Sequence, residues 1–122
     1  MKVLLIDDDQ FIQAVYKSAL SQENIEVVLS SDGEDGMQKA ISEVPDLVLL
    51  DMLLPKKDGF DVIHDLKSNP ALAQIPIIVI SALSQDADIA KVKELGAVEY
   101  LPKGQFSPQE VTEKIKNILI KQ

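Results

Sequence analysis

Four short apolar runs in this chain lead to side chains that can do chemistry. These side chains are, in chain order, Asp7, Asp8, Asp9, Asp51, Ser81 and Lys103. Neighbouring carboxylates repel one another unless a cation lies between them, and a hard divalent cation prefers oxygen ligands. A carboxylate beside such a cation can attack phosphorus and form an acyl phosphate. A lysine and a hydroxyl group can then hold the phosphoryl oxygens, so these residue types suggest phosphoryl transfer to an aspartate.

The predicted metal site combines carboxylate and backbone oxygens. Asp8 and Asp51 can each give one carboxylate oxygen, and a backbone carbonyl of the loop after Asp51 can give a third. We expect this carbonyl to be that of Leu53. Mg²⁺ suits a shallow site in which the ion keeps several of its waters. The expected cofactor is therefore Mg²⁺.

The apolar runs have the composition of buried parallel strands. They are continuous stretches of leucine and β-branched residues, as is typical of a sheet that helices cover on both faces. The predicted strands are residues 3–6, 25–29, 47–50, 77–80 and 98–101. Residues just beyond the carboxyl ends of such strands line the crevice where open α/β sheets bind ligands. The chemically capable side chains are therefore expected at one edge of one sheet.

Segments with helical periodicity separate these strands. Residues 12–20 repeat apolar side chains at the spacing of an amphipathic helix, and Asp9 stands at its N-cap position. A second helix begins at Asp32-Gly33 and ends before Pro45. The side chains that it should turn inward are Met37, Ala40, Ile41 and Val44. Further helices are expected over 60–66, over 86–95 and from residue 108.

Two later helices carry terminal signals. Gly96 is expected to cap the C-terminus of the helix over 86–95. Ser107 and Glu110 have the spacing of a capping box, with Pro108 at the first helical position of the last helix. These signals support a regular alternation of strands and helices along the whole chain.

The alternation predicts an α/β protein of (βα)₅ type. Right-handed crossovers place helices on both faces of a parallel sheet. For a doubly wound, flavodoxin-like unit with five strands, the expected strand order is 2-1-3-4-5. This order places the first and third strands side by side, so it brings Asp7, Asp8 and Asp51 together.

Length and composition limit the class of protein. The chain has 122 residues, of which 46% are hydrophobic and 26% are charged, so we expect one globular domain over 1–122. The absence of cysteine excludes disulfides, thiol catalysis and zinc–thiolate sites. No segment has the length of a signal peptide core or a membrane span, so cytoplasmic residence without a membrane partner is expected.

The charge of the chain limits its partners. The net charge is −8, which argues against nucleic acid as a direct partner. The basic side chains are all lysines, so bound phosphate would meet point charges, backbone N–H groups or metal and no guanidinium group.

The motifs resemble those of the receiver domain of two-component response regulators. In family order and at family spacing, the chain carries Ile6-Asp7-Asp8-Asp9, Leu49-Leu50-Asp51-Met52-Leu53-Leu54-Pro55, Asp58-Gly59, Ile80-Ser81-Ala82 and Tyr100-Leu101-Pro102-Lys103. The resemblance covers essentially the whole chain. It implies the same fold and strand order, and a phosphorylatable signalling switch.

The resemblance also implies roles for individual residues. Asp51 would be the phosphoacceptor, modified to 4-aspartylphosphate, and would ligate Mg²⁺ together with Asp8. Asp7 would support the metal through its waters. Lys103 would pair with the phosphoryl group. Ser81 would be the switch hydroxyl that moves toward it, and the aromatic residue whose exposure tracks Ser81 would be Tyr100.

The chain departs from the family pattern at two places. Gly104 follows Lys103, where family members usually have proline, so a more mobile loop is expected there. Leu53 and Leu83, two residues past Asp51 and Ser81, are apolar and cannot orient an attacking water. We therefore expect the phosphorylated form to hydrolyse slowly.

The expected function is signalling and not catalytic turnover, although the domain would assist its own phosphorylation and dephosphorylation. The phosphoryl donor would be a histidine kinase or a histidine phosphotransfer protein. A downstream protein would be bound through the face formed by the helix over 86–95, the strand over 98–101 and the last helix. Little sequence follows that helix, so no output domain is expected after it. The formation of a weak dimer on phosphorylation is left as an open possibility.

Three alternatives remain. The chain could be a receiver domain cut from a longer regulator or hybrid kinase. It could be an Mg²⁺-dependent phosphohydrolase, but such enzymes usually carry a second aspartate where this chain has Leu53, and a cap for which it has no length. A module that keeps the fold without being phosphorylated is disfavoured by the full set of acidic, hydroxyl and ammonium groups.

Overall fold

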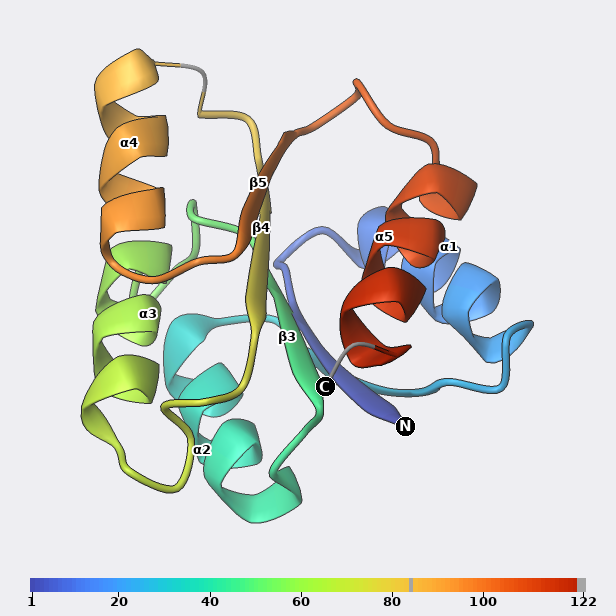
Figure 1. Ribbon diagram of the computed structural model, residues 1–122, viewed down its shortest axis with the longest axis horizontal. Coiled ribbons are helices and arrows are strands. Elements are labelled where there is room, and N and C mark those ends of the chain that lie inside the picture. The colour runs from blue at the N-terminus through green and yellow to red at the C-terminus, as the bar shows by residue number, and fades with distance from the viewer. Residues whose placement is uncertain (84, 121–122) are drawn as a thin grey trace.

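The computed structural model describes residues 1–83 and 85–120, which form five strands alternating with five helices (Figure 1). The strands are β1 (Lys2–Ile6), β2 (Glu26–Ser30), β3 (Leu47–Leu50), β4 (Ile77–Ser81) and β5 (Glu99–Pro102). The helices are α1 (Gln10–Ser21), α2 (Gly33–Glu43), α3 (Gly59–Ser68), α4 (Asp86–Glu94) and α5 (Pro108–Ile120). The strands pair in parallel in the order β2-β1-β3-β4-β5. The predicted fold and strand order are therefore confirmed.

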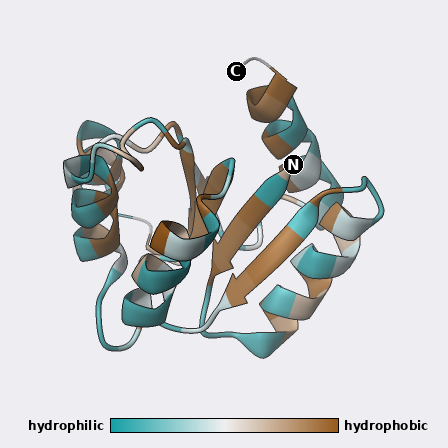
Figure 2. Cartoon of the chain, turned by 90° about the horizontal axis from the view of Figure 1, so that it is seen from below, coloured by the Kyte–Doolittle hydropathy of each residue, from teal (hydrophilic) through white to brown (hydrophobic). Residues whose placement is uncertain are grey.

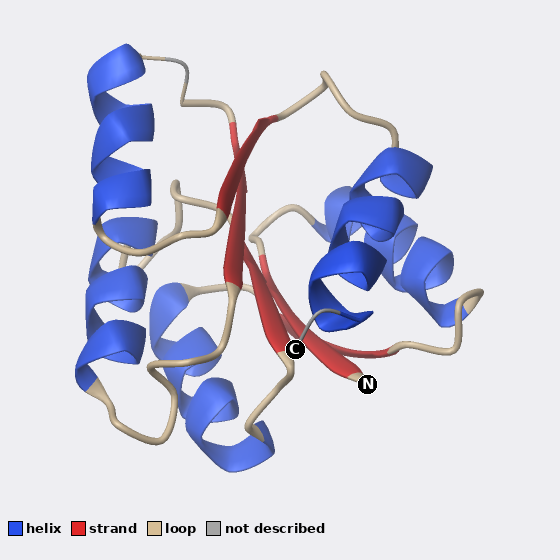
Figure 3. Cartoon of the chain, viewed as in Figure 1, coloured by secondary structure: helices blue, strands red, loops and turns tan. Residues whose placement is uncertain are grey.

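The sheet is the middle of three layers (Figure 3). Helices α1 and α5 cover one face, and α2, α3 and α4 cover the other (Figure 1). The strands are coloured mostly hydrophobic in Figure 2, whereas the helices mix hydrophobic and hydrophilic residues. Most strand residues are buried. This distribution explains why the strands read as continuous apolar runs, because both of their faces are buried.

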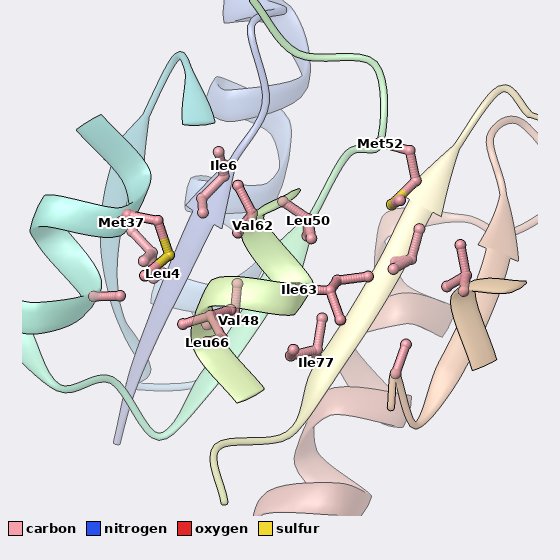
Figure 4. Close-up of a cluster of buried hydrophobic side chains, with 14 of the residues drawn as sticks. Leu4, Ile6, Met37, Val48, Leu50, Met52, Val62, Ile63, Leu66 and Ile77 are labelled. Atoms are coloured by element: carbon pink, nitrogen blue, oxygen red, sulfur yellow. The ribbon is translucent and has the colours of Figure 1, made fainter. Parts of the chain in front are cut away.

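Alternate strand residues supply the two apolar cores. Leu4, Ile6, Val48 and Leu50 pack under α2 and α3 with Met37, Met52, Val62, Ile63 and Leu66 (Figure 4). Val3, Leu5, Leu47 and Leu49 point to the opposite face and pack with residues of α1 and α5. Because each strand is locked by burial on both faces, a register slip would move apolar groups out of both cores. The strand ends that carry the site are therefore held in fixed positions.

The predicted helix termini are confirmed. Asp9 accepts hydrogen bonds from the backbone N–H groups of Phe11 and Ile12 at the start of α1. The Ser107 Oγ accepts from the Glu110 N–H at 3.1 Å, and the Glu110 carboxylate accepts from the Ser107 N–H at 2.9 Å. Gly96 has a φ of +117° just after α4, as expected for a glycine cap.

The prediction for the inner face of α2 was partly wrong. Met37 and Ala40 are buried as expected, but Ile41 and Val44 are 58% and 54% exposed. The helix approaches the sheet through Gly36, where an added Cβ would lie 2.6 Å from the Ile6 Cδ1. This close approach orients the buried stripe along Gly33, Gly36, Met37 and Ala40. Ile41 therefore turns outward, and Val44 lies beyond the last helical residue.

No helix in the described part of the chain combines the length and apolar character needed to cross a bilayer.

Candidate functional site

The strand order brings the chemically capable side chains to one edge of the sheet. Ile6 at the end of β1 pairs with Leu50 at the end of β3, so Asp7 and Asp51 follow adjacent strand ends. The Asp51 N–H donates to the Ile6 carbonyl at 3.0 Å and extends this pairing by one residue. Carboxylate oxygens of Asp7, Asp8 and Asp51 all lie within 4.8 Å of one another. Their proximity therefore follows from the sheet topology.

Asp51 lies at the centre of this arrangement. Its side chain is buried, and its Oδ2 accepts a hydrogen bond from the Lys103 Nζ at 3.0 Å. Its Oδ1 accepts from the backbone N–H of Leu53 at 3.2 Å. Lys103 reaches it because the Lys103 N–H donates to the Ser81 carbonyl at 2.9 Å, beyond the paired ends of β4 and β5. One carboxylate oxygen is thus held by an ammonium group and the other by the loop.

Asp7 is the most buried carboxylate of the cluster, with 1% of its surface exposed. Burial raises the pKa of Asp7, and the neighbouring Asp51 charge adds to this effect. A hydrogen bond from the Asp9 N–H and the Lys103 ammonium, 3.3 Å from the Asp7 Oδ2, act in the opposite direction. The net shift is upward, so ionised Asp7 is held at an energetic cost.

Lys103 neutralises only part of the acidic charge. Burial alone would lower the pKa of Lys103, but its contacts with Asp51 and Asp7 outweigh burial and raise it. Lys103 therefore stays protonated while it contacts two carboxylates. A cluster of three carboxylates with one ammonium group has surplus negative charge, which fits a hard divalent cation.

Asp8 and Leu53 lie at the outer side of this cluster. Asp8 is exposed, so an ion held there would keep contact with solvent. The Leu53 side chain is 54% exposed, and its N–H is bound to Asp51. Leu53 and Leu83 line a hollow next to Asp8, so apolar side chains border the carboxylates. The role of the Leu53 carbonyl as a metal ligand stays a prediction.

Ser81 and Tyr100 are joined through the backbone of Leu83. The Ser81 hydroxyl is fully buried and accepts a hydrogen bond from the Leu83 N–H at 3.3 Å. The Tyr100 hydroxyl donates to the Leu83 carbonyl, and the Tyr100 side chain is buried. Burial raises the pKa of Tyr100, and the Ser81 hydroxyl partly opposes this shift. A movement of Ser81 would therefore disturb a segment that Tyr100 also holds.

One buried polar residue near the site was missed in the sequence. Gln13 lies on the inner face of α1 with Tyr16 and Leu20, and its side-chain amide donates to the Asp7 carbonyl at 2.7 Å. The signal was present, because Gln13 precedes Tyr16 by three residues and Leu20 by seven on an amphipathic helix. Asp9, in contrast, caps α1 as predicted and is not one of the clustered carboxylates.

The fold and site define a doubly wound α/β protein with an acidic cluster and a lysine at the edge where the strand order reverses. Comparison with known proteins identifies its family. A family model for the response regulator receiver domain matches residues 3–116. The chain therefore belongs to the response regulator receiver family, as the motifs predicted. Domains of this family are phosphoacceptor signalling domains and not typical enzymes.

Individual proteins support the same assignment. The alkaline phosphatase synthesis transcriptional regulatory protein PhoP of Bacillus subtilis (strain 168) is 37% identical over 118 residues, which are 97% of this chain and 48% of that protein. A putative response regulator from Chloroflexus aurantiacus J-10-fl has a TM-score of 0.89 at 30% identity, covering 98% of this chain and 97% of that one. The chain thus spans about half the length of curated relatives such as PhoP.

A third comparison concerns metal binding. The Mn²⁺-bound form of response regulator Rcp1 has a TM-score of 0.81 at 28% identity, covering 96% of this chain and 90% of that one. A divalent cation is therefore bound in a solved structure of the same fold. In this chain the donor set of Asp7, Asp8 and Asp51 is consistent with a divalent metal site.

Proposed function

We propose that Asp51 accepts a phosphoryl group from a phosphohistidine of a histidine kinase or histidine phosphotransfer protein, in a step that requires Mg²⁺. The observation that carries this proposal is the buried Asp51 carboxylate, which contacts the Lys103 ammonium and lies within 4.8 Å of the acidic pair that follows β1. A bond forms between an Asp51 oxygen and phosphorus, and the bond between phosphorus and the imidazole nitrogen breaks. The product is an acyl phosphate, 4-aspartylphosphate.

The surrounding residues would hold both the metal and the phosphoryl group. Asp8, Asp51 and the Leu53 carbonyl would ligate Mg²⁺, and Asp7 would orient its waters. Bound Mg²⁺ supplies positive charge that offsets the repulsion between a phosphoryl group and the carboxylates. Lys103, already 3.0 Å from Asp51, needs little movement to hold a phosphoryl oxygen.

The signal would pass through Ser81 and Tyr100. Phosphorylation adds roughly −1.5 to −2 charges and three acceptor oxygens at the site. The Ser81 hydroxyl would turn from the Leu83 N–H to a phosphoryl oxygen, which changes the segment that Tyr100 holds. The face of α4, β5 and α5 would then change its affinity for a downstream protein, either of another kind or as a weak dimer of this chain. A cytoplasmic location belongs to the same proposal.

A second form of this proposal takes account of chain length. PhoP is a transcriptional regulatory protein of about twice the length that the chain covers. The same switch could therefore act within a longer regulator or a hybrid kinase, where the output would lie in another domain. Steady turnover of a phosphate monoester would instead favour the Mg²⁺-dependent phosphohydrolase, which the exposed, apolar Leu53 disfavours.

The test is incubation with acetyl phosphate in Mg²⁺ or in excess chelator, followed by intact-mass spectrometry. Wild-type protein should gain one phosphoryl group only when Mg²⁺ is present. Asp51→Asn should gain none, and Lys103→Met should gain it far more slowly because a contact to the phosphoryl group is lost. Equal labelling of Asp51→Asn and wild type, or equal labelling in chelator, would contradict the proposal.

A further inference from the structure

A buried amide on α1 holds the backbone under the acidic cluster. Gln13 is 9% exposed, and its Nε2 lies close to three acceptors, one just after β1 and two at the end of β2 and directly after it. It is 2.7 Å from the Asp7 carbonyl, 3.1 Å from the Ser30 carbonyl and 3.1 Å from the Ser31 Oγ. Two N–H hydrogens are thus distributed over three oxygens, with the shortest contact to Asp7. Gln13 therefore links the end of β1 to the end of β2 through hydrogen bonds.

These contacts determine the orientation of one peptide unit. Because the Asp7 carbonyl is held by Gln13, the peptide plane between Asp7 and Asp8 cannot turn freely. The Asp7 N–H is also bound, to the Ser30 carbonyl at 3.0 Å. The Asp7 carboxylate accepts from the Asp9 N–H at 2.9 Å, and the Gln13 N–H donates to the Asp9 carbonyl at 3.0 Å. The acidic segment is thus fixed at its backbone and at one carboxylate.

The chemistry of an amide suits this position. The carboxylates of Asp7, Asp8 and Asp51 repel one another in the absence of metal, which favours displacement of the exposed Asp8 segment. An amide can restrain the carbonyl of Asp7 without adding a positive charge that would compete with a cation. A charged donor in the same place would form ion pairs with the carboxylates instead. Gln13 therefore restrains the backbone at Asp7 and leaves the negative charge of the carboxylates free to bind a cation.

We propose that Gln13 is a positioning residue that presents the carboxylates of Asp7 and Asp8 for divalent metal binding. The proposal rests on the metal part of the proposed function. Gln13 touches neither metal nor phosphoryl group, and its effect passes through the Asp7 carbonyl. Groups that hydrogen-bond the side chain of a metal ligand typically account for about 10-fold to 100-fold in metal affinity. Gln13 bonds the backbone of the acidic segment, so we expect its effect at the lower end of this range.

The experiment compares Mg²⁺ affinity, by isothermal titration calorimetry, with thermal stability in chelator. Gln13→Met keeps the length of the side chain and removes the donors. Thr112→Val is the matched control, because Thr112 is also buried and its Oγ1 donates to a backbone carbonyl, that of Pro108, at 2.8 Å in α5. Both variants should lose stability. Gln13→Met should bind Mg²⁺ about 10-fold more weakly, whereas Thr112→Val should bind it like wild type.

The outcomes separate this inference from the proposed function. If wild type binds Mg²⁺ and folded Gln13→Met binds it with the same affinity, the role of Gln13 is overturned and the proposed function is not affected. Absence of Mg²⁺ binding in wild type would overturn both this role and the metal part of the proposed function. If the Mg²⁺ affinities are as expected but acetyl phosphate does not label the protein, the role of Asp51 as phosphoacceptor is overturned. The role of Gln13 in metal binding is then still supported.

A measurement on wild-type protein decides the case in which Gln13→Met does not fold. The side-chain NH₂ signals of Gln13 in a ¹⁵N-correlated spectrum should exchange slowly with water and shift during Mg²⁺ titration. Gln38, which is exposed on α2, is the control and should do neither. If the Gln13 NH₂ hydrogens exchange rapidly with water and their signals do not shift with Mg²⁺, the proposal is overturned.

Discussion

Asp7 illustrates how a buried carboxylate of this site lowers the stability of the fold near neutral pH. Burial and the charge of Asp51 raise the pKa of Asp7, so the folded state holds its proton more tightly than the unfolded state does. The contribution of Asp7 to stability is therefore greatest at low pH and is lost as the pH rises through its folded-state pKa. Near neutral pH the ionised group destabilises the metal-free fold.

We predict that Asp7→Asn increases the free energy of unfolding of the metal-free protein at pH 7, because the pKa of Asp7 is raised in the folded state. The amide keeps an oxygen for the Asp9 N–H and removes the buried charge. Urea denaturation in chelator measures the change, and the difference from wild type should shrink toward acidic pH. Glu94→Gln, at an exposed position of α4, is the control and should change stability little. A less stable Asp7→Asn protein at pH 7 would contradict this view.

The apolar residues beside the carboxylates would affect the lifetime of the proposed acyl phosphate on Asp51. Leu53 and Leu83 line the hollow next to Asp8 and offer an attacking water no hydrogen-bonding side chain. We predict slow hydrolysis in wild type and, in Leu53→Asn, acceleration on the order of 10-fold, because an amide can orient water. Decay of the phosphorylated mass after removal of acetyl phosphate gives both rates. A wild-type lifetime of seconds, or no acceleration in Leu53→Asn, would count against the prediction.

At the scale of elements, glycines let the helices approach the loops that form the site. An added Cβ at Gly59 would lie 2.5 Å from the Met52 Cα and 2.9 Å from the Asp51 carbonyl oxygen. The first residue of α3 thus packs directly on the segment that carries Asp51. The Gly59 N–H also donates to the Met52 carbonyl at 3.0 Å, which closes the loop between β3 and α3.

We predict that Gly59→Ala costs about 1–3 kcal/mol of stability through overpacking and also slows phosphorylation. The backbone at residues 51–52 has to move, which displaces the Asp51 carboxylate from Lys103. Gly96→Ala is the control, since its φ of +117° makes alanine unfavourable by about 1–2 kcal/mol at a position outside the site. Thermal denaturation and acetyl phosphate labelling should show that both variants are less stable and that only Gly59→Ala is labelled more slowly.

The elements also show which parts of the structure could be predicted from the sequence. The strands and caps were predictable because their signals are local: continuous apolar runs, Asp9 before α1, and Ser107 with Glu110 at α5. The inner face of α2 was not, because Ile41 turns outward when Gly36 meets Ile6, a contact between distant segments. Local periodicity contains no information about how closely a helix approaches a sheet.

The site, too, has features that could be predicted from the sequence and features that could not. Convergence of Asp7, Asp51 and Lys103 followed from strand order, because parallel strands end at a common edge. The link from Ser81 through Leu83 to Tyr100, and the amide of Gln13 under Asp7, needed coordinates. These contacts involve loop backbone atoms, and the sequence carries no clear signal for the positions of such atoms.

At the scale of the whole molecule, the sheet lies between two helical layers and the site lies at one edge of that sheet, from which Ser81 at the end of β4 and Lys103 just after β5 lead toward α4 and β5 (Figure 1). We predict that phosphorylation changes hydrogen exchange mainly in residues 81–83, α4 and β5, because the contacts of Ser81 and Tyr100 with Leu83 rearrange. Exchange measured by mass spectrometry should show the change in wild type. Ser81→Ala should still be phosphorylated but should show a much smaller change.

A change of equal size in Ser81→Ala, or one confined to α1 and α2, would contradict this route of signalling. Helix α1 serves as an internal reference, since it packs on the opposite face of the sheet from α4. The net charge of −8 leads to a further expectation for the same samples, namely that neither form binds DNA at physiological salt.

The most direct test of the central claim is to locate the phosphoryl group on the chain. Borohydride reduces an aspartyl phosphate to homoserine, which stays in the peptide and is found by tandem mass spectrometry. After loading with acetyl phosphate in Mg²⁺, homoserine should appear at position 51. Its appearance at position 7 or 8 instead, or its absence from fully labelled protein, would contradict the claim that Asp51 is the acceptor.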